Sequence, residues 1–356
     1  MAQTTTGEAP APAQPGTRTT AYDAAFFAPF APATALDIVR RVPGFMIAQS
    51  NGNVRGFAGA AGNVVFNGAR ASSKSDSIET ILARIPANRV ARIEIGPGDL
   101  YGSDFSGKSQ VLNVIFTAEG GVDGNATVKA ARVYGGRIVP NADASVLVRR
   151  GTSSINLAAG TGRFDSQEKG FDRLSALPGG QLIEFRRKVN IFKPRQPFVS
   201  ASWGVEQAAD RAFHVNARWA PNTFDLVQTN LVTPASGPLR DDRLVQRYDT
   251  PGYELGGDVS RPLAGGTIKF VALANRRDRK TYDASFNRIA GETVGGFEQR
   301  VDSRYDEVLG RLSWARANLL GLSFELGSEL AYNRLDNATE LFLVGGDGGR
   351  SQIDLP

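Results

Sequence analysis

The residues best suited to bind a ligand are two basic runs in the second half of the chain. They are Arg186-Arg187-Lys188 and Arg276-Arg277, and the second run leads on to Arg279 and Lys280. Guanidinium and ammonium groups gathered on one surface attract anions and speed their encounter with the protein. The runs therefore indicate either a site for an anionic ligand or a solvated polar rim, and the second is the commoner outcome.

The rest of the composition offers little that could perform catalysis or hold a metal ion. The 356 residues include no cysteine, two methionines and one histidine, His214, which stands alone on the polar side of an alternating segment. Thiolate sites and imidazole clusters are thereby excluded, and no nucleophile lies beside a base in a recognisable context. A formal net charge of +5 is too small to indicate nucleic-acid binding. We expect no enzyme, no metal site, no cofactor and no nucleic-acid partner.

Residues 34–118 have the pattern of a small α+β domain. A first helix is predicted from Thr34, with Asp37 as its capping-box partner, and Pro43-Gly44 ends it. A second is predicted by apolar residues at helical spacing, with Asp76 and Glu79 in its first turn and Pro86 as its stop. These apolar residues are Ile78, Ile81, Leu82 and Ile85. Strands are expected at 45–49, 63–67, 90–96 and 110–116, with turns at Asn67-Gly68 and Gly96-Pro97-Gly98.

Residues 1–33 are rich in Ala, Pro and Thr, which predicts a flexible, partly extended tail. Four aromatic residues stand out in it: Tyr22, Phe26, Phe27 and Phe30. Aromatic side chains in such a segment either dock on the parent domain or bind a partner, and both possibilities stay open.

From about residue 124 the sequence alternates between apolar and polar residues. Val199, Ala201 and Trp203, for example, alternate with Ser200 and Ser202. Segments of about ten residues with one apolar side are typical of strands between lipid and a wet interior, although a soluble β-sandwich also alternates. Nine strands are expected, near 124–134, 140–150, 153–164, 196–206, 211–221, 252–262, 267–278, 303–316 and 322–335.

The connections between these strands alternate in length. After the first hairpin, short links fall at 151–152, 207–210, 263–266 and 317–321, and long ones at 165–195, 222–251 and 279–302. This asymmetry is typical of outer-membrane barrels, which have short turns on one side and long loops on the other. Nine strands cannot enclose a domain of this size, since barrels with a plugged interior have about 22. We therefore expect the N-terminal part of a longer protein, with an incomplete barrel.

Eight short motifs follow one another in a fixed order between Thr34 and Phe116. They are Val42-Pro43-Gly44, Arg55-Gly56, Val64-Val65-Phe66-Asn67-Gly68, Ile85-Pro86, Arg92-Ile93-Glu94, Gly96-Pro97-Gly98, Tyr101-Gly102 and Leu112-Asn113-Val114. In these motifs the chain resembles the plug domain of the TonB-dependent outer-membrane receptor family, and residues 119–356 resemble it only as a barrel pattern. Asn67 stands where the family usually has Asp, and Gln110 where a Gly often precedes the last strand.

The resemblance implies a plug domain followed by an antiparallel transmembrane β-barrel in the outer membrane of a Gram-negative cell. It implies import of a scarce extracellular small molecule, such as a ferric siderophore, driven by a TonB-type inner-membrane protein that acts on the N-terminal segment. No short TonB box is recognisable, so Tyr22, Phe26, Phe27 and Phe30 are the candidate contact by position. The basic runs would then lie in outer loops, near an anionic ligand or near the phosphates of lipopolysaccharide and other outer-membrane lipid.

The resemblance also marks the motif residues of the plug as candidate functional residues. For the glycines we favour a role in the fold, because tight turns need glycine. Arg92 and Glu94 would form a latch of the plug or, more commonly, a surface ion pair. The full set is Arg55, Gly56, Asn67, Gly68, Arg92, Glu94, Gly96, Gly98, Tyr101 and Asn113.

The expected organisation is a tail at 1–33 with the candidate TonB contact, a plug at 34–118 and the barrel part at 119–356. Two other functions stay open. One is a plugged outer-membrane barrel that binds or senses a ligand without import. The other is a soluble β-rich interaction protein in which the alternating faces pack as a sandwich.

Overall fold

The computed structural model describes residues 18–48, 62–68, 70, 77–101, 105, 107–117, 120–208, 210–319 and 322–354. The chain divides into two compact units, Met1–Gly120 and Gly121–Pro356, which are described separately. Among the described residues no helix is long and apolar enough to cross a bilayer.

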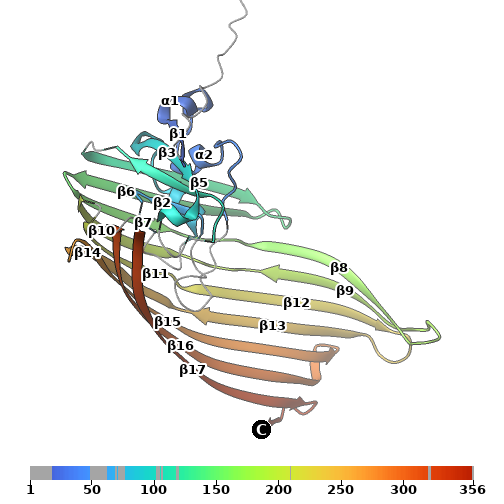
Figure 1. Cartoon of the computed structure of the whole chain (residues 1–356). Helices are drawn as coiled ribbons and strands as arrows, with labels where there is room; N and C mark the ends of the chain where they lie inside the picture. Colours follow the sequence, from blue (N-terminus) through green and yellow to red (C-terminus); the bar gives the residue numbers. More distant parts are fainter. Residues whose placement is uncertain are drawn as a thin grey trace, which may run out of the picture. The chain divides into compact units, whose positions relative to one another are not determined.

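The first unit is built on a four-stranded sheet with the order β1-β3-β4-β2 (Figure 1). β2 and β4 run parallel, and the other neighbours run antiparallel. The strands are β1 (Thr20–Asp23), β2 (Val64–Phe66), β3 (Val90–Gly96) and β4 (Val111–Phe116), and the helices are α1 (Ala24–Phe27), α2 (Ala35–Val39) and α3 (Ile78–Ala83). Short 3-10 turns are η1 (Ala28–Phe30), η3 (Ala87–Arg89) and η4 (Gly98–Tyr101). No strand forms at the described residues 45–48, so the prediction of one at 45–49 is wrong there.

Both predicted helices begin at a side-chain cap. The Thr34 hydroxyl accepts the N–H of Asp37, and the Asp37 carboxylate accepts the N–H groups of Thr34 and Ala33 at 2.9 and 3.1 Å, which confirms the capping box. At α3 the cap is Ser77, whose hydroxyl accepts the N–H of Thr80 at 3.1 Å. Asp76, expected in the first turn of α3, lies outside the described residues.

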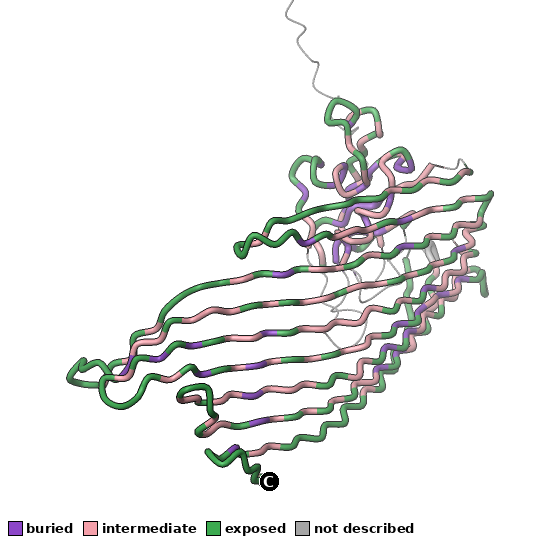
Figure 2. The backbone as a smooth tube through the Cα atoms, turned by 180° about the vertical axis from the view of Figure 1, so that it is seen from behind, coloured by how far each residue is buried: buried purple, intermediate pink, exposed green. Residues whose placement is uncertain are grey.

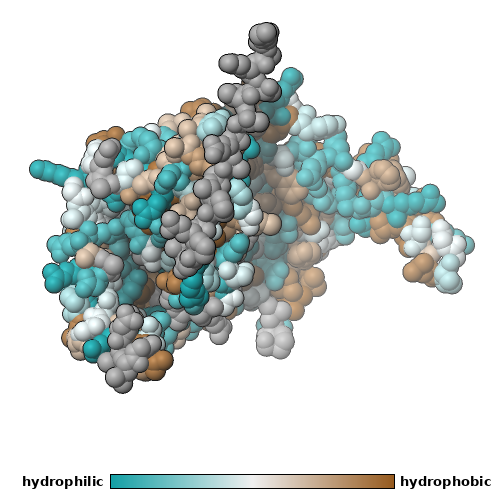
Figure 3. Space-filling view, turned by 45° about the horizontal axis from the view of Figure 1, so that its top comes forward, coloured by the Kyte–Doolittle hydropathy of each residue, from teal (hydrophilic) through white to brown (hydrophobic). Residues whose placement is uncertain are grey.

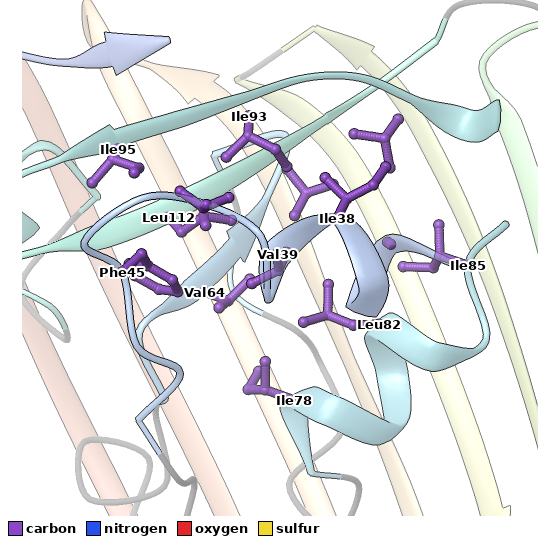
Figure 4. Close-up of a cluster of buried hydrophobic side chains, with 14 of the residues drawn as sticks. Ile38, Val39, Phe45, Val64, Ile78, Leu82, Ile85, Ile93, Ile95 and Leu112 are labelled. Carbon is purple, nitrogen blue, oxygen red and sulfur yellow. The ribbon is translucent and has the colours of Figure 1, made fainter. Parts of the chain in front are cut away.

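The helices cover the sheet through one apolar core (Figure 4). Ile38 and Val39 of α2 and Leu82 of α3 meet Ile93 of β3 and Leu112 of β4, and each of the five is at most 1% exposed. Full burial of one such side chain stabilises a fold by roughly 1.5–3 kcal/mol. This core holds the plug motifs on β2, β3 and β4 in place.

The aromatic segment before Thr34 belongs to this core, so the expectation of a flexible tail is wrong for residues 20–30. β1 pairs antiparallel with β3, and Tyr22 lies opposite Ile93. Phe27 is fully buried in the core, while Tyr22 and Phe26 pack against it. Their three rings lie 5.0–6.2 Å apart.

The second unit is a single antiparallel sheet of 14 strands (Figures 1 and 2). Each of the nine predicted strands coincides with one of its strands, namely β5 (Gly121–Arg132), β6 (Ile138–Arg150), β7 (Ser153–Gly160), β10 (Phe198–Ala208), β11 (Arg211–Trp219), β14 (Gly252–Leu263), β15 (Gly266–Ile289), β16 (Glu292–Leu319) and β17 (Leu322–Gly345). The predicted strands, and the fold of a plug followed by part of an antiparallel barrel sheet, are confirmed.

The predicted long loops at 165–195, 222–251 and 279–302 are wrong, because most of these residues extend the sheet. They contain β8 (Ser166–Ser175), β9 (Leu182–Phe192), β12 (Asn222–Pro234), β13 (Arg240–Thr250) and the hairpin between β15 and β16. Along one side β15 pairs first with β14 and then with β13, and along the other it pairs with β16. The fourteenth strand, β18 (Arg350–Ile353), pairs with β17.

The two faces of this sheet differ in chemistry, and the strand register defines them. One row runs across six strands as Val199, Trp219, Tyr253, Arg276, Asp306 and Arg334, with Ala201, Ala217, Leu255, Ala274, Val308 and Tyr332 in the next row on that side. We call this side the apolar face. The opposite side, the polar face, carries Ser200, Arg218, Glu254, Asn275, Glu307 and Asn333.

Candidate functional site

Four of the predicted plug residues are joined by hydrogen bonds between β3, β4 and the turn after β2, and a fifth, Asn67, is bonded to Phe116 of β4. Arg92 Nε donates to Glu94 at 2.7 Å, and Asn113 Nδ2 donates to the same carboxylate at 3.3 Å. The Asn113 Oδ1 atom accepts the Gly68 N–H at 2.8 Å, and Asn67 Oδ1 accepts the N–H of Phe116 at 3.1 Å. The side chains of Arg92 and Glu94 are half and one-quarter exposed, so their ion pair contributes under about 1 kcal/mol.

The Asn67-Gly68 turn takes the left-handed conformation that its residues favour. Asn67 has φ 47° and Gly68 has φ 79°, values that other residue types adopt only under strain. Because Asn113 and Asn67 tie this turn to β4, the network fixes the end of β2 in its parallel register. The hydrogen bonds found for the turn, from Asn67 N–H to Val114, from Gly68 N–H to Asn113 and from Phe116 N–H to Asn67, all join it to β4, which indicates a structural role.

The Gly-Pro-Gly turn after β3 is a close approach of two backbone segments. A Cβ on Gly98 would lie 1.7 Å from the carbonyl oxygen of Phe105, and one on Gly96 would lie 2.8 Å from Thr19 Cγ2. Tyr101 packs beside Phe105 in a small second core. Burial, followed by the negative charge of Glu94, raises the pKa of Tyr101. The candidates Arg55 and Gly56 lie outside the described residues.

The aromatic candidates for the TonB contact divide into buried and exposed members. Tyr22, Phe26 and Phe27 dock on their own domain, and Phe30 is 49% exposed, with the Arg41 guanidinium 5.1 Å from its ring centroid. β1 lies at the edge of the four-stranded sheet. An edge strand carries backbone groups to which another strand can be added.

The predicted basic runs do not act as single clusters, because their neighbours point to opposite faces. Arg276 lies opposite Tyr253 on the apolar face, so Arg277 lies on the polar face. The register of β9 with β12, of β12 with β13 and of β13 with β15 places Arg187 on the apolar face with Arg276. Arg186 and Lys188 lie on the polar face.

Carboxylates neutralise much of the charge in both runs. Arg186 pairs with Glu184, which also accepts from Arg240 at 3.0 Å, and Lys188 pairs with Asp172. On the apolar face Arg276 pairs with Asp278 at 3.0 Å, and Arg304 reaches the same carboxylate at 3.0 Å. These pairs favour a solvated polar rim over a concentrated anion site at either run.

His214 is not isolated, contrary to the sequence-based expectation. On the polar face its Nδ1 lies 3.1 Å from Asp258 and its Nε2 lies 3.3 Å from Glu206. Three strands, β10, β11 and β14, bring these residues together from positions up to 52 apart, beyond the reach of a local motif. In the described part of the chain no group of three or more His, Cys, Asp or Glu side chains is placed to hold a metal ion.

The apolar face is largely exposed. Trp203, Trp219, Tyr253, Leu255 and Tyr332 are 44–60% exposed, and a surface groove of about 710 Å³ runs among residues of the two rows defined above. Contiguous apolar surface of this extent marks contact with lipid or another apolar phase. The extension made by β8, β9, β12 and β13 carries hydrophilic and hydrophobic residues side by side (Figure 3), and Phe171, Ile183 and Leu231 are among its exposed apolar side chains.

Comparison with known proteins identifies the first unit. Residues 13–107 match the family model described as the TonB-dependent receptor plug domain, and no curated protein matches. Among solved structures, the chain is similar to the ferric yersiniabactin uptake receptor FyuA from Yersinia pestis, with 12% identity, 94% of this chain and 60% of that chain covered, and a TM-score of 0.27. It is also similar to Pseudomonas aeruginosa FpvA bound to a ferric pyoverdine, with 10% identity, 91% and 54% covered, and a TM-score of 0.30.

With TM-scores this low, neither structure decides the assignment, and the chain spans only 54–60% of their length. The plug match decides it, in agreement with the motifs on β2, β3 and β4 and with the incomplete barrel sheet. Residues 13–107 therefore belong to the plug-domain family of TonB-dependent receptors.

Proposed function

We propose that this chain is part of a transporter that imports a scarce ligand across the outer membrane with energy from a TonB-type inner-membrane protein. Residues 1–33 would receive that energy, residues 34–118 would block the pore, and residues 119–356 would form the N-terminal part of the barrel. The ligand would be a small molecule bound from outside, such as a ferric siderophore or another large nutrient. The observation that carries the proposal is the plug domain at residues 13–107.

The position of β1 supplies a physical route for the energy. Only four residue pairs join β1 to β3, whereas β3 and β4 are held by six pairs and by the Glu94–Asn113 contact. A partner strand could add to the free side of β1 by β-augmentation, so that force acts on backbone hydrogen bonds. Force on β1 would pull first on β3 and on the Phe27 anchor in the core.

Disulfide trapping tests the contact with the TonB-type protein. The chain has no cysteine, so single cysteines can be introduced without background. A Phe30→Cys receptor in its own membrane should crosslink to cysteines in the periplasmic part of the TonB-type protein. Met46→Cys is the matched control, because Met46 is 85% exposed in the same unit and lies outside the aromatic segment Tyr22–Phe30 in the sequence. Equal crosslinking at the two positions would contradict the proposed contact.

Uptake is measured on a variant that leaves the plug core intact. Phe30→Asp should abolish energy-dependent accumulation of radiolabelled ferric chelate by cells and leave binding of the chelate to de-energised cells unchanged. If uptake persists in this variant, the aromatic segment does not couple energy. A receptor that only binds or senses its ligand would show chelate binding with no energy-dependent accumulation even in the parent. The family consists of receptors and transporters, and we propose no catalytic step.

A further inference from the structure

A buried carboxylate lies where the sheet changes its pairing. Strand β7 pairs with β6, whereas β8, which continues the same stretch of chain, pairs only with β9. Asp165 stands between β7 and β8, and its side chain is 1% exposed. An isolated charge at this depth needs partners of opposite sign.

Three arginines from three segments surround Asp165. Arg137 comes from the turn between β5 and β6, Arg163 from the link after β7, and Arg195 from the link between β9 and β10, and each forms an ion pair with Asp165. Within the described chain, every ion pair found for these arginines is to Asp165. The cluster therefore has three positive charges against one negative charge. Neutralising Asp165 needs only one arginine.

One of these arginines has a buried donor without an acceptor. The Nε atom of Arg163 is buried and has no hydrogen-bond partner among the described residues. Leaving such a group unsatisfied costs about 1–3 kcal/mol. The Arg163 side chain is 35% exposed, and an anion beside its exposed part would offset the excess positive charge.

The cluster opens on the side of the sheet that carries the exposed apolar residues. Arg163 and Arg195 are bridge partners, and Arg195 is in turn a bridge partner of Thr223. Thr223 lies opposite Asp249 on β13, and Asp249 lies opposite Lys280 on β15. Lys280 is on the same face of β15 as Arg276, so Arg163 and Arg195 lie on the apolar face. An anion bound there would come from outside the barrel sheet.

We propose that Arg137, Arg163 and Arg195 form a binding site for a phosphate-type anion. Guanidinium groups bind phosphate oxygens through paired, charge-assisted hydrogen bonds, and the excess of two positive charges matches a phosphate monoester. The position on the apolar face favours the headgroup phosphate of a membrane lipid as the source. Soluble phosphate has the same chemistry and is separated from it by experiment. The site is independent of the import proposed above.

The test uses the full-length receptor extracted from its own outer membrane and freed of lipid in detergent. Native mass spectrometry measures its binding of lipid A with both phosphates, of the same lipid without phosphates, and of inorganic phosphate. The double variant Arg163→Gln/Arg195→Gln and the single variant Arg137→Gln remove parts of the site. Arg304→Gln is the matched control, an arginine on the same face whose carboxylate partner is Asp278. Arg137, in a turn, provides a variant that leaves the strands unchanged.

The parent and the Arg304→Gln control should bind phosphorylated lipid A in preference to the dephosphorylated lipid. Both site variants should bind it at least about tenfold more weakly, as expected from loss of hydrogen bonds between charged groups. Equal losses for inorganic phosphate would assign the site to a soluble anion. Site variants that bind both probes as the control does would overturn the proposal.

Asp165→Asn separates anion binding from simple charge neutralisation. If the arginines serve only to hold Asp165, this variant loses the cluster and binds no better than the arginine variants, which would overturn the proposal. If they hold an anion, removing the carboxylate raises the excess positive charge, and phosphate-dependent binding should equal or exceed that of the parent.

Discussion

Replacing Phe27 with alanine should strongly destabilise the first unit. Phe27 is 0% exposed and packs edge-on against Phe26 with their ring centroids 5.0 Å apart. Truncation of a fully buried phenylalanine costs about 3–5 kcal/mol, from lost transfer free energy and from the cavity left behind. Phe30→Ala, at a half-exposed ring three residues on, should change stability by less than about 1 kcal/mol.

Hydrogen exchange of the intact receptor measures this difference locally. Amides of α2, β3 and β4 report the free energy of opening of the first unit. In Phe27→Ala they should exchange about a hundredfold or more faster than in the parent, whereas those of Phe30→Ala should be nearly unchanged. Spectroscopy of tryptophan does not suit the purpose, since Trp203, Trp219 and Trp314 all lie in the second unit. Equal exchange in the two variants would refute the conclusion that the aromatic segment is part of the core.

Two further predictions concern the plug. Gly98→Ala should prevent the turn after β3 from forming, because the new Cβ would collide with the Phe105 carbonyl, whereas Gly107→Ala, which meets nothing within 4 Å, should be tolerated; protease resistance of the plug measures both. Burial alone raises the pKa of Asp37, but hydrogen bonds from Thr34 and Ala33 outweigh it and hold the pKa below the ordinary 3.8. A carboxyl whose pKa is lower in the folded than in the unfolded chain stabilises the fold at a pH above its unfolded-state pKa. This stabilisation is lost as the pH falls through the folded-state pKa. Asp37→Asn should therefore lower the free energy of unfolding of the plug by about 1 kcal/mol at neutral pH and leave it unchanged in strong acid. Hydrogen exchange of the variant and the parent at both pH values measures this difference.

The elements with a one-sided apolar pattern could be predicted from the sequence. The capping box at Thr34, the apolar spacing in α3 and all nine strands with an apolar face were found in this way. The outer extensions were missed because period-2 alternation is visible only while one face is apolar. In β8 and β13, both faces of the strand carry charged or polar residues. The composition of these two strands is therefore that of a loop, and the sequence pattern does not distinguish them from one.

The candidate site depended more on contacts between distant residues. Glycine motifs identified the turns, but nothing in the sequence shows that Asn113 accepts from Gly68, 45 residues away. The segment around Phe27 was misjudged because small residues and prolines around it suggested disorder. Adjacent positive charges suggested common clusters, whereas strand geometry sends Arg276 and Arg277 to opposite faces.

The change of partner along β15 divides the sheet into two parts whose strand pairing is independent, one paired with β14 and one paired with β13. β14 fixes the register of its first half, whereas the β12–β13 and β8–β9 hairpins are joined to the sheet only beyond that point. A one-residue slip in the first half would exchange its apolar and polar faces, which lipid forbids. The hairpins beyond it can lengthen, shorten or be exchanged between relatives without altering that register. Changes in these hairpins therefore leave unchanged the pairing of β15 with β14, where the apolar face is defined.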